Sequence, residues 1–139
     1  MREAQRADGK INLSGVWRGL YSSQTIDFPI SFVATLLERG RTLSGVTEET
    51  RSTVSSNSKS ARNKAQIDGM RHSRLVDFIK TYDDQALGLF RVNFAGLVSR
   101  DASEIAGQWS RQDGTGGTFL MVRQSHLVEA DEQASDIEA

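Results

Sequence analysis

The chain has 139 residues, a net charge of −1 and a hydrophobic fraction of 37%, which suits one domain with a buried core rather than two domains. It contains no cysteine and two histidines, so we expect no disulfide, no thiolate metal site and no histidine-rich metal centre. No metal and no bound cofactor are expected. No stretch is apolar for long enough to span a membrane, and the charged N-terminus does not resemble a secretory leader. These features predict a cytoplasmic protein.

Strand-like segments recur at close spacing from residue 15 onward, and helix signals are scarce. The connectors at 39–41, 71–73 and 99–103 are short, and QDGTG at 112–116 is typical of a glycine-rich hairpin. Eight short strands without a crossover helix predict an all-β antiparallel meander that closes into an up-and-down barrel. The predicted strands cover 15–23, 28–38, 42–49, 65–71, 74–82, 87–98, 104–111 and 117–124.

Three segments differ from this strand pattern. The connector 50–64 reads TRSTVSSNSKSARNK, which is too polar for a buried strand and predicts a long mobile loop. Residues 126–139 contain five acidic residues and no lysine or arginine, which is typical of a flexible acidic tail. We therefore expect a flexible N-terminus at 1–12, a barrel domain at 13–125 and a flexible tail at 126–139.

Alternation within the strands assigns one face of each strand to the barrel interior. Small residues accompany large ones on this face, as a small barrel requires where its strands bend or approach closely. The predicted inward-facing residues are Trp17, Gly19, Tyr21, Phe28, Ile30, Phe32, Ala34, Leu36, Leu43, Gly45, Ile67, Gly69, Val76, Phe78, Val92, Phe94, Gly96, Ile105, Gly107, Trp109, Phe119 and Met121.

Three short motifs resemble calycin-type barrels, the grouping of lipocalins, fatty-acid-binding proteins and avidins. LSGVWRGLY at 13–21 is similar to their first strand, TLSGVTEE at 42–49 to the third strand of avidins, and IAGQW at 105–109 to a later avidin strand. The pattern is most similar to small bacterial members without an assigned activity. The resemblance covers about residues 13–124 and implies an eight-stranded barrel that binds a small molecule.

The same resemblance argues against biotin as the ligand. Gly19 stands where avidins carry a polar residue for the biotin ureido group, and Thr47 stands where they carry a tyrosine. The last strand, GTFLMVRQ at 117–124, has no counterpart of the avidin aspartate. The disulfide of lipocalins is also absent.

The longer connectors, which follow the first, third, fifth and seventh strands, all gather at one end of such a barrel. We expect this end to be the mouth, because loops on a rigid scaffold commonly form binding sites. Lys80 and Tyr82 end the fifth strand there, and a lysine that faces inward must be paired or wet. Lys80 either pairs with Glu48 or Glu49, or extends to water, or receives a ligand head group. The candidate ligand-binding residues are Lys80, Tyr82, Trp17, Tyr21, Phe32, Thr47, Glu48, Glu49, Phe78 and Trp109.

The opposite, short-loop end is rich in arginine. Its turns either carry ordinary solvated charge or form an anion-binding face. No aromatic residues are interleaved with these arginines, which disfavours single-stranded nucleic acid as a partner. Arg123 faces inward at this end, where we expect it to plug the barrel by reaching backbone carbonyls or Glu38. The candidate anion-contacting residues are Arg39, Arg41, Arg71, Arg74 and Arg100.

Several apolar residues fall on the outward phase, and a contiguous outer band typically marks an interface. We therefore expect a homodimer or a larger homo-oligomer. These outward residues are Leu75, Ile79, Leu87, Leu89, Leu120 and Val122.

The leading functional hypothesis is a non-catalytic barrel that binds a small amphipathic or anionic molecule near Lys80 and Tyr82. The alternative is a protein-interaction or inhibitor module that uses the outer wall or the arginine-rich end. A third interpretation is an isomerase or cyclase, which would need an acid–base pair facing a cavity. No residue spacing requires catalysis, so no catalytic residue is assigned.

Overall fold

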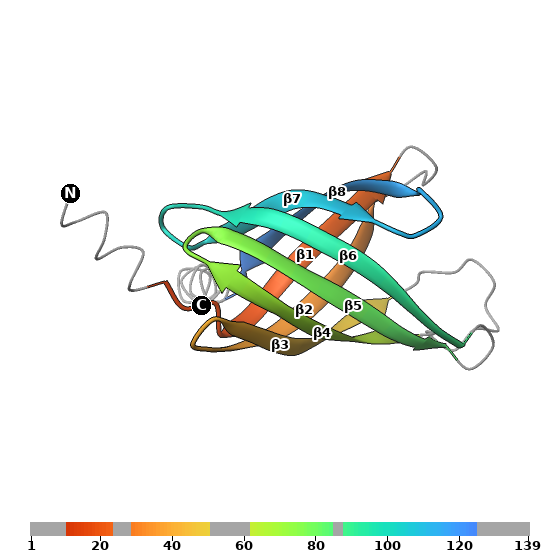
Figure 1. Ribbon diagram of the computed structural model, residues 1–139, viewed down its shortest axis with the longest axis horizontal. Helices are drawn as coiled ribbons and strands as arrows, with labels where there is room; N and C mark the ends of the chain where they lie inside the picture. Colours follow the sequence, from red (N-terminus) through yellow and green to blue (C-terminus); the bar gives the residue numbers. More distant parts are fainter. Residues whose placement is uncertain (1–10, 24–28, 51–61, 85–87, 125–139) are drawn as a thin grey trace, which may run out of the picture.

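The computed structural model describes residues 11–23, 29–50, 62–84 and 88–124, and the following account concerns these residues. They form a closed eight-stranded barrel in which each strand follows its neighbour in sequence order (Figure 1). The described residues include no helix long and apolar enough to cross a membrane. The strands are β1 (Gly15–Ser23), β2 (Ile30–Arg39), β3 (Thr42–Thr50), β4 (Arg62–His72), β5 (Leu75–Asp84), β6 (Gly88–Val98), β7 (Glu104–Ser110) and β8 (Gly116–Arg123).

Antiparallel pairing between β1 and β8 closes the barrel. Closure joins Gly19 to Met121 on β8, while the same glycine pairs with Phe32 on β2. Because both sides of β1 are paired, closure removes the exposed strand edges that favour aggregation. The predicted fold class is therefore confirmed.

The middle strands extend further than the sequence pattern indicated. β4 begins at Arg62 rather than at residue 65, and β5 ends at Asp84 rather than at residue 82. These additional residues are polar. Antiparallel strands can contain polar residues because their pairing is between backbone groups and one face of the sheet can meet water. Part of the predicted long loop is therefore strand, while residues 51–61 of that loop lie outside the described residues, as do Phe28, Leu87 and the predicted acidic tail.

The interior follows the predicted alternation. Along β2, buried and exposed residues alternate from Phe32 to Arg39. Phe78 and Phe94 stack with their ring centroids 5.0 Å apart, and Phe119 meets both rings edge-on. A Cβ atom at Gly19 would lie 2.2 Å from Cζ of Phe32, so this ring packs directly against bare backbone.

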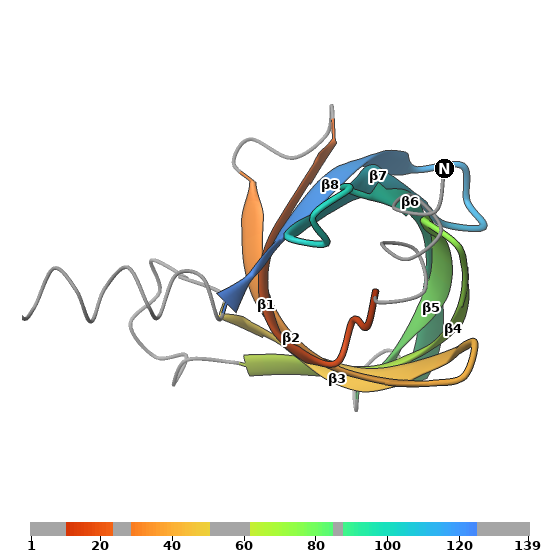
Figure 2. The same cartoon turned by 90° about the vertical axis from the view of Figure 1, so that its left-hand side faces the viewer.

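A short N-terminal segment, residues 11–14, closes the end of the barrel that carries the short turns. Figure 2 looks along the barrel and shows this segment crossing its opening. Ile11 and Leu13 are buried, and the Trp17 indole N–H donates a hydrogen bond to the Leu13 carbonyl at 2.9 Å. The predicted boundary between a flexible end and the barrel, at residues 12 and 13, falls within this segment.

Charged side chains hold this segment in place. Glu38 accepts a hydrogen bond from the Leu13 N–H at 2.9 Å and pairs with the Arg71 guanidinium at 2.7 Å. Arg71 also donates to the Ile11 carbonyl at 3.0 Å. Ionised partners make such hydrogen bonds stronger than neutral ones, so this end is sealed by a charge-assisted network.

Arg123 contributes to the same closure, as expected. Its guanidinium donates to the carbonyls of Asn12, Ser14 and Ala102 at 2.7, 3.2 and 3.0 Å. The guanidinium carbon lies 4.6 Å from the Trp17 ring centre, which is within the range of a cation–π contact. Arg123 was predicted to reach either backbone carbonyls or Glu38, and its hydrogen bonds go to backbone carbonyls.

Candidate functional site: a polar cluster inside the barrel

Four polar side chains meet inside the barrel toward the end opposite the sealed one, and we call them the polar cluster. They are Lys80 and Tyr82 from β5, Glu49 from β3 and Tyr21 from β1. Lys80, Glu49 and Tyr82 are buried, with exposed fractions of 0%, 2% and 7%, and Tyr21 is half-buried. The strand alternation that buries the apolar core also directs these four residues inward.

Glu49 is the centre of the cluster. Its carboxylate accepts hydrogen bonds from the Tyr82 hydroxyl and, at 2.9 Å, from the Tyr21 hydroxyl. Lys80 Nζ lies 3.5 Å from Glu49 Oε2 and 3.4 Å from the Tyr82 hydroxyl oxygen. The two tyrosine contacts satisfy the carboxylate well, whereas both lysine contacts lie at the long limit of hydrogen bonding.

Aromatic rings surround the Lys80 ammonium. Nζ lies 4.0 Å from the centre of the Phe32 ring, 4.8 Å from Phe94 and 5.1 Å from Tyr21. With Glu49 and Tyr82, these residues come from β1, β2, β3, β5 and β6. The ammonium therefore lies toward the middle of the barrel rather than against one wall.

Burial dominates the electrostatics of the cluster. It lowers the pKa of Lys80 to about 8, although the Glu49 carboxylate opposes this shift. Burial, assisted by the Glu49 charge, raises the pKa of Tyr21 and of Tyr82 above the ordinary value. Near neutral pH both tyrosines are therefore hydroxyl donors, and Lys80 is a cation that releases its proton more readily than an exposed lysine.

The position of Lys80 corrects one expectation from the sequence. Lys80 does not lie at the rim, because β5 continues four residues past it and the cluster side chains cover it. Of its predicted partners, it is Glu49 that reaches the ammonium.

Trp109 packs edge-on against Tyr21 at 5.6 Å between ring centres, and its indole N–H donates to the Ser22 carbonyl at 3.0 Å.

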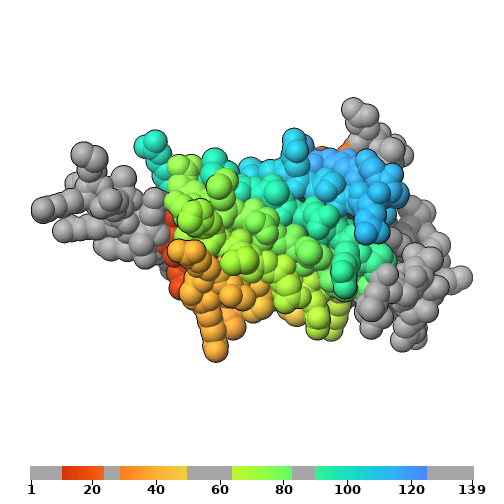
Figure 3. Space-filling view, viewed as in Figure 1, coloured from red at the N-terminus to blue at the C-terminus, as the bar shows by residue number. Residues whose placement is uncertain are grey.

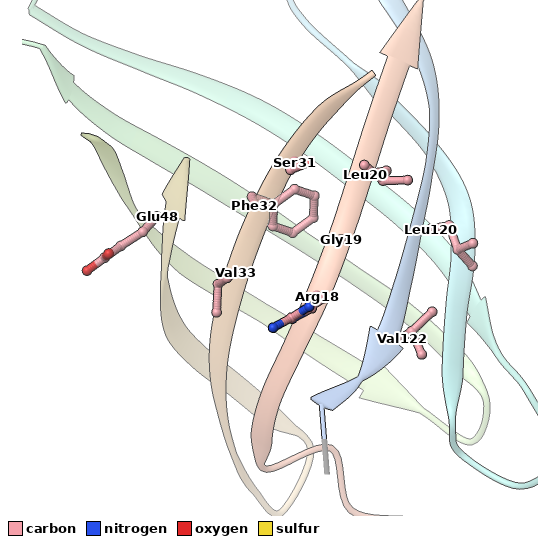
Figure 4. Close-up of a pocket in the computed structure, with 9 residues that line it drawn as sticks. All are labelled: Arg18, Gly19, Leu20, Ser31, Phe32, Val33, Glu48, Leu120 and Val122. Atoms are coloured by element: carbon pink, nitrogen blue, oxygen red, sulfur yellow. The ribbon is translucent and has the colours of Figure 1, made fainter. Parts of the chain in front are cut away.

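Two other candidate residues lie away from the cluster. Glu48 points to the outer wall, where its carboxylate lies 4.0 Å from Lys64 Nζ, because its neighbour Glu49 takes the inward phase (Figure 4). Trp17 is inward-facing, but it packs under Arg123 at the sealed end. Neither residue is brought to Lys80.

The remaining candidates line the interior near the cluster. Thr47 is fully buried, and its hydroxyl has no hydrogen-bond partner in the described part of the chain. Phe78 stacks on Phe94. Two contact residues were missing from the predicted site: Phe94, which faces Lys80, and Phe90, which stacks on Tyr82 with ring centres 4.7 Å apart. Both share the inward phase of Val92, so the strand alternation contained the signal for them.

The five candidate arginines at the sealed end divide into two groups. Arg71 binds Glu38 and backbone carbonyls, and Arg74 donates to the Val98 carbonyl at 2.7 Å. Arg39, Arg41 and Arg100 are exposed. Two of the five guanidinium groups are thus already engaged within the fold.

The outer wall carries a shallow apolar hollow of about 480 Å³ over β8, β1 and β2 (Figure 4). Leu20, Val33 and Leu120 are each about two-fifths exposed there, and Arg18 and Glu48 also line the hollow. A second group of exposed apolar residues lies on β4, β5 and β6, the strands that face the viewer in the space-filling view (Figure 3). It comprises Met70, Leu75, Ile79 and Leu97.

Comparison with known proteins supports the barrel fold but does not identify a family for the chain. No family model matches the chain, and no curated protein matches it. The redesigned beta barrel b11L5F_LGL is similar with a TM-score of 0.65 and 17% identity, covering 85% of this chain and 95% of that one. The redesigned beta barrel mFAP1, bound to DFHBI, has a TM-score of 0.63 and 16% identity, covering 88% of this chain and 100% of that one. Membership of the calycin grouping therefore remains a resemblance.

Proposed function

We propose that the protein is a non-catalytic barrel that binds a small amphipathic molecule, with the polar head of the ligand at the polar cluster. The observation that carries this proposal is the Lys80 ammonium, which is fully buried among aromatic rings yet makes only two hydrogen bonds to described residues, both long. An apolar enclosure with a few convergent polar groups is the usual form of a small-molecule site. The similarity to a barrel that holds DFHBI is consistent with this use of the fold.

The charge balance of the cluster favours an uncharged polar head. Glu49 neutralises Lys80, so an anionic head group would meet the Glu49 carboxylate as well as the ammonium. An uncharged carbonyl or hydroxyl oxygen could accept a hydrogen bond from an ammonium N–H of Lys80 without this repulsion. The Thr47 hydroxyl, which has no partner among the described residues, is a second group available to such a ligand.

Native mass spectrometry tests this proposal on protein purified without denaturation. We expect an additional bound mass that is lost when the protein unfolds. Titration with the uncharged dye Nile red should give saturable binding, and Lys80→Met should weaken it about tenfold, the loss of one hydrogen bond. The control variant is Lys64→Met, which removes an exposed lysine of the outer wall. Undiminished affinity in a folded Lys80→Met protein would exclude the polar cluster as the site.

We also propose self-association through the hollow on β8, β1 and β2. Arg18 pairs with Val122 on β8 and with Val33 on β2, and Val33 pairs with Glu48 on β3, so a cation and an anion lie on opposite sides of Val33 within the patch. In a twofold dimer each patch meets its own copy, and such a patch is self-complementary. An apolar outer patch rimmed by charge is typical of protein interfaces.

Light scattering after size exclusion tests this assembly. We expect a dimer for the wild type and a monomer for Leu20→Lys, because the new charge would be buried in the interface. Leu75→Lys is the matched control, since Leu75 is equally apolar and lies on the other exposed group. A monomeric wild type, or a dimer that only Leu75→Lys disrupts, would refute this surface.

A further inference from the structure

Lys80 carries a buried amine, which is a nucleophile when it is not protonated. Non-covalent binding of a ligand does not require this reactivity. A buried ion pair contributes little net stability relative to apolar residues of similar volume, so packing alone gives no reason for an amine in the middle of a barrel. Its ammonium also lies 4.0 and 4.8 Å from the centres of the Phe32 and Phe94 rings, so apolar groups border the amine on two sides.

The groups around the amine form a connected path for a proton. Lys80 donates to the Tyr82 hydroxyl, and that hydroxyl donates to the Glu49 carboxylate. The Tyr21 hydroxyl binds the other carboxylate oxygen. An amine, a hydroxyl and a carboxylate in mutual contact can supply the nucleophile, the proton relay and the counter-ion that condensation with a carbonyl compound needs.

We propose that Lys80 captures an aldehyde as an imine, in the same site to which the proposed function assigns the ligand and therefore resting on that function. The lone pair of the neutral amine attacks the aldehyde carbon, and the π electrons of the carbonyl move to its oxygen. That oxygen takes a proton and the nitrogen loses one, giving a carbinolamine. A second proton then lets the hydroxyl leave as water, and the carbon–nitrogen double bond forms as a protonated imine, which becomes the neutral imine when its nitrogen releases that proton. Amine and aldehyde thus yield imine and water, without an oxidant or reductant.

The surroundings favour each stage of this condensation. The lowered pKa of Lys80, about 8, makes more neutral amine available near neutral pH than an exposed lysine offers. The Tyr82 hydroxyl and the Glu49 carboxylate lie where protons must move. A protonated imine keeps the positive charge of the ammonium, so the Glu49 carboxylate can serve as its counter-ion.

The walls indicate the class of aldehyde. Phe32 and Phe94 face the amine, and Phe78 and Phe119 pack against the Phe94 ring. Such walls suit an aldehyde on an aromatic or conjugated apolar body, and disfavour sugars and other polar aldehydes. The charged or titratable groups that face the amine are Glu49, Tyr82 and Tyr21, and the more distant Arg111 charge acts on Tyr21.

Reductive trapping tests the proposal on the full chain. The protein is incubated with cinnamaldehyde and sodium cyanoborohydride near neutral pH, and peptide mapping locates the alkylated lysines. The chain has four lysines, Lys10, Lys59, Lys64 and Lys80, so each site can be followed separately. We expect Lys80 to be modified at least about tenfold faster than Lys64, the exposed internal control, because a lower pKa gives more neutral amine. Equal modification of all four lysines, or an unmodified Lys80, would overturn the proposal.

A non-aldehyde analogue separates this inference from the proposed function. Cinnamyl alcohol has the same apolar body but cannot form an imine, and its binding is measured by calorimetry. Alcohol binding together with an unmodified Lys80 refutes imine formation and leaves the binding function standing. If cinnamyl alcohol does not bind and Lys80 is not modified, both the binding function and imine formation are refuted. Selective trapping at Lys80, lost in Lys80→Met and retained in Lys64→Met, supports the imine; because the wild-type map identifies the site directly, the conclusion does not depend on the folding of the variant.

Discussion

The two ends of this barrel bury charged side chains in opposite ways. At the sealed end, Glu38, Arg71 and Arg123 direct their charges onto backbone groups of residues 11–14, with hydrogen bonds of 2.7 to 3.2 Å. At the other end, Lys80 directs its charge toward the middle of the barrel, and its hydrogen bonds are long. The first arrangement is what structural closure requires, whereas the second leaves hydrogen-bonding capacity for something else. Burial of a charge therefore does not by itself identify a site; the quality of its contacts separates the two ends.

The strongest test of this contrast removes the carboxylate at the sealed end. Glu38→Ala should lower the free energy of unfolding by about 3–5 kcal/mol, because it leaves the Arg71 guanidinium without its partner and the Leu13 N–H without an acceptor. Urea denaturation measures the loss. Glu48→Ala is the matched control on the outer wall and should cost less than about 1 kcal/mol. Similar losses in both variants would mean that Glu38 does not seal the barrel.

The second test replaces both members of an ion pair at each end. Lys80→Met alone should destabilise the fold by roughly 2–3 kcal/mol, somewhat below the usual cost of a stranded buried charge because Tyr21 and Tyr82 still bind Glu49. Adding Glu49→Gln should restore stability to within about 1 kcal/mol of the wild type.

The corresponding pair at the sealed end should behave differently. Arg71→Met with Glu38→Gln should not recover, because Arg71 also binds the Ile11 carbonyl and Glu38 also binds the Leu13 N–H. Chemical denaturation of the singles and doubles gives both coupling energies. Equal recovery at the two ends would contradict the distinction between them.

The pH dependence of stability should report on the polar cluster. The pKa of Lys80 is about 8 in the folded state, against an ordinary lysine value of 10.5 for the unfolded chain, so between these values the unfolded chain binds more protons. Stability should therefore rise with pH across this window, by at most about 1.4 kcal/mol per pH unit for one proton. It should fall again above about pH 10, where unfolding would release the tyrosine protons that Tyr21 and Tyr82 retain in the fold.

The measurement is urea denaturation at a series of pH values between neutrality and about pH 10, the upper limit set by tyrosine ionisation. Lys80→Met should lose the rise, whereas Lys64→Met should keep it. If the rise persists in Lys80→Met, another group must be responsible for it.

The smallest expected effect concerns Thr47. Its buried hydroxyl has no partner among the described residues, so Thr47→Val should change the free energy of unfolding by no more than about 1 kcal/mol, in the stabilising direction. Thermal denaturation of the two proteins without ligand is sufficient. A clear destabilisation would mean that the hydroxyl makes a contact in solution and is not available to a ligand.

The fold was predictable because strand alternation is a strong local signal. The inward phase of residues such as Phe32 and Phe94 follows from period-two patterning alone. The sealing segment was not predictable in the same way, since Ile11 and Leu13 flank a single polar residue in a stretch too short to show a period. Its role depends on contacts with Glu38 and Arg71, which are distant in sequence.

The residues of the candidate site were predictable from the sequence, but the burial of Lys80 within the barrel was not. Lys80, Tyr82, Tyr21 and Glu49 were all among the expected residues, and the structure brings them together. Two consecutive glutamates left the phase of β3 open, and only the pairing of the strand fixes Glu49 inward. The length of β5 depends on backbone pairing of polar residues, which hydrophobic patterning does not register, so Lys80 was expected nearer to water than it lies.

The two tryptophans of the chain divide between the two ends. Trp17 lies beneath Arg123 at the sealed end, and Trp109 packs against Tyr21 at the polar cluster. Each indole is buried, and each is the local chromophore of a different end of the barrel. A pair of single-tryptophan proteins, Trp17→Phe and Trp109→Phe, would thus give two separate intrinsic emission signals, one that follows occupancy of the interior and one that follows release of the N-terminal segment.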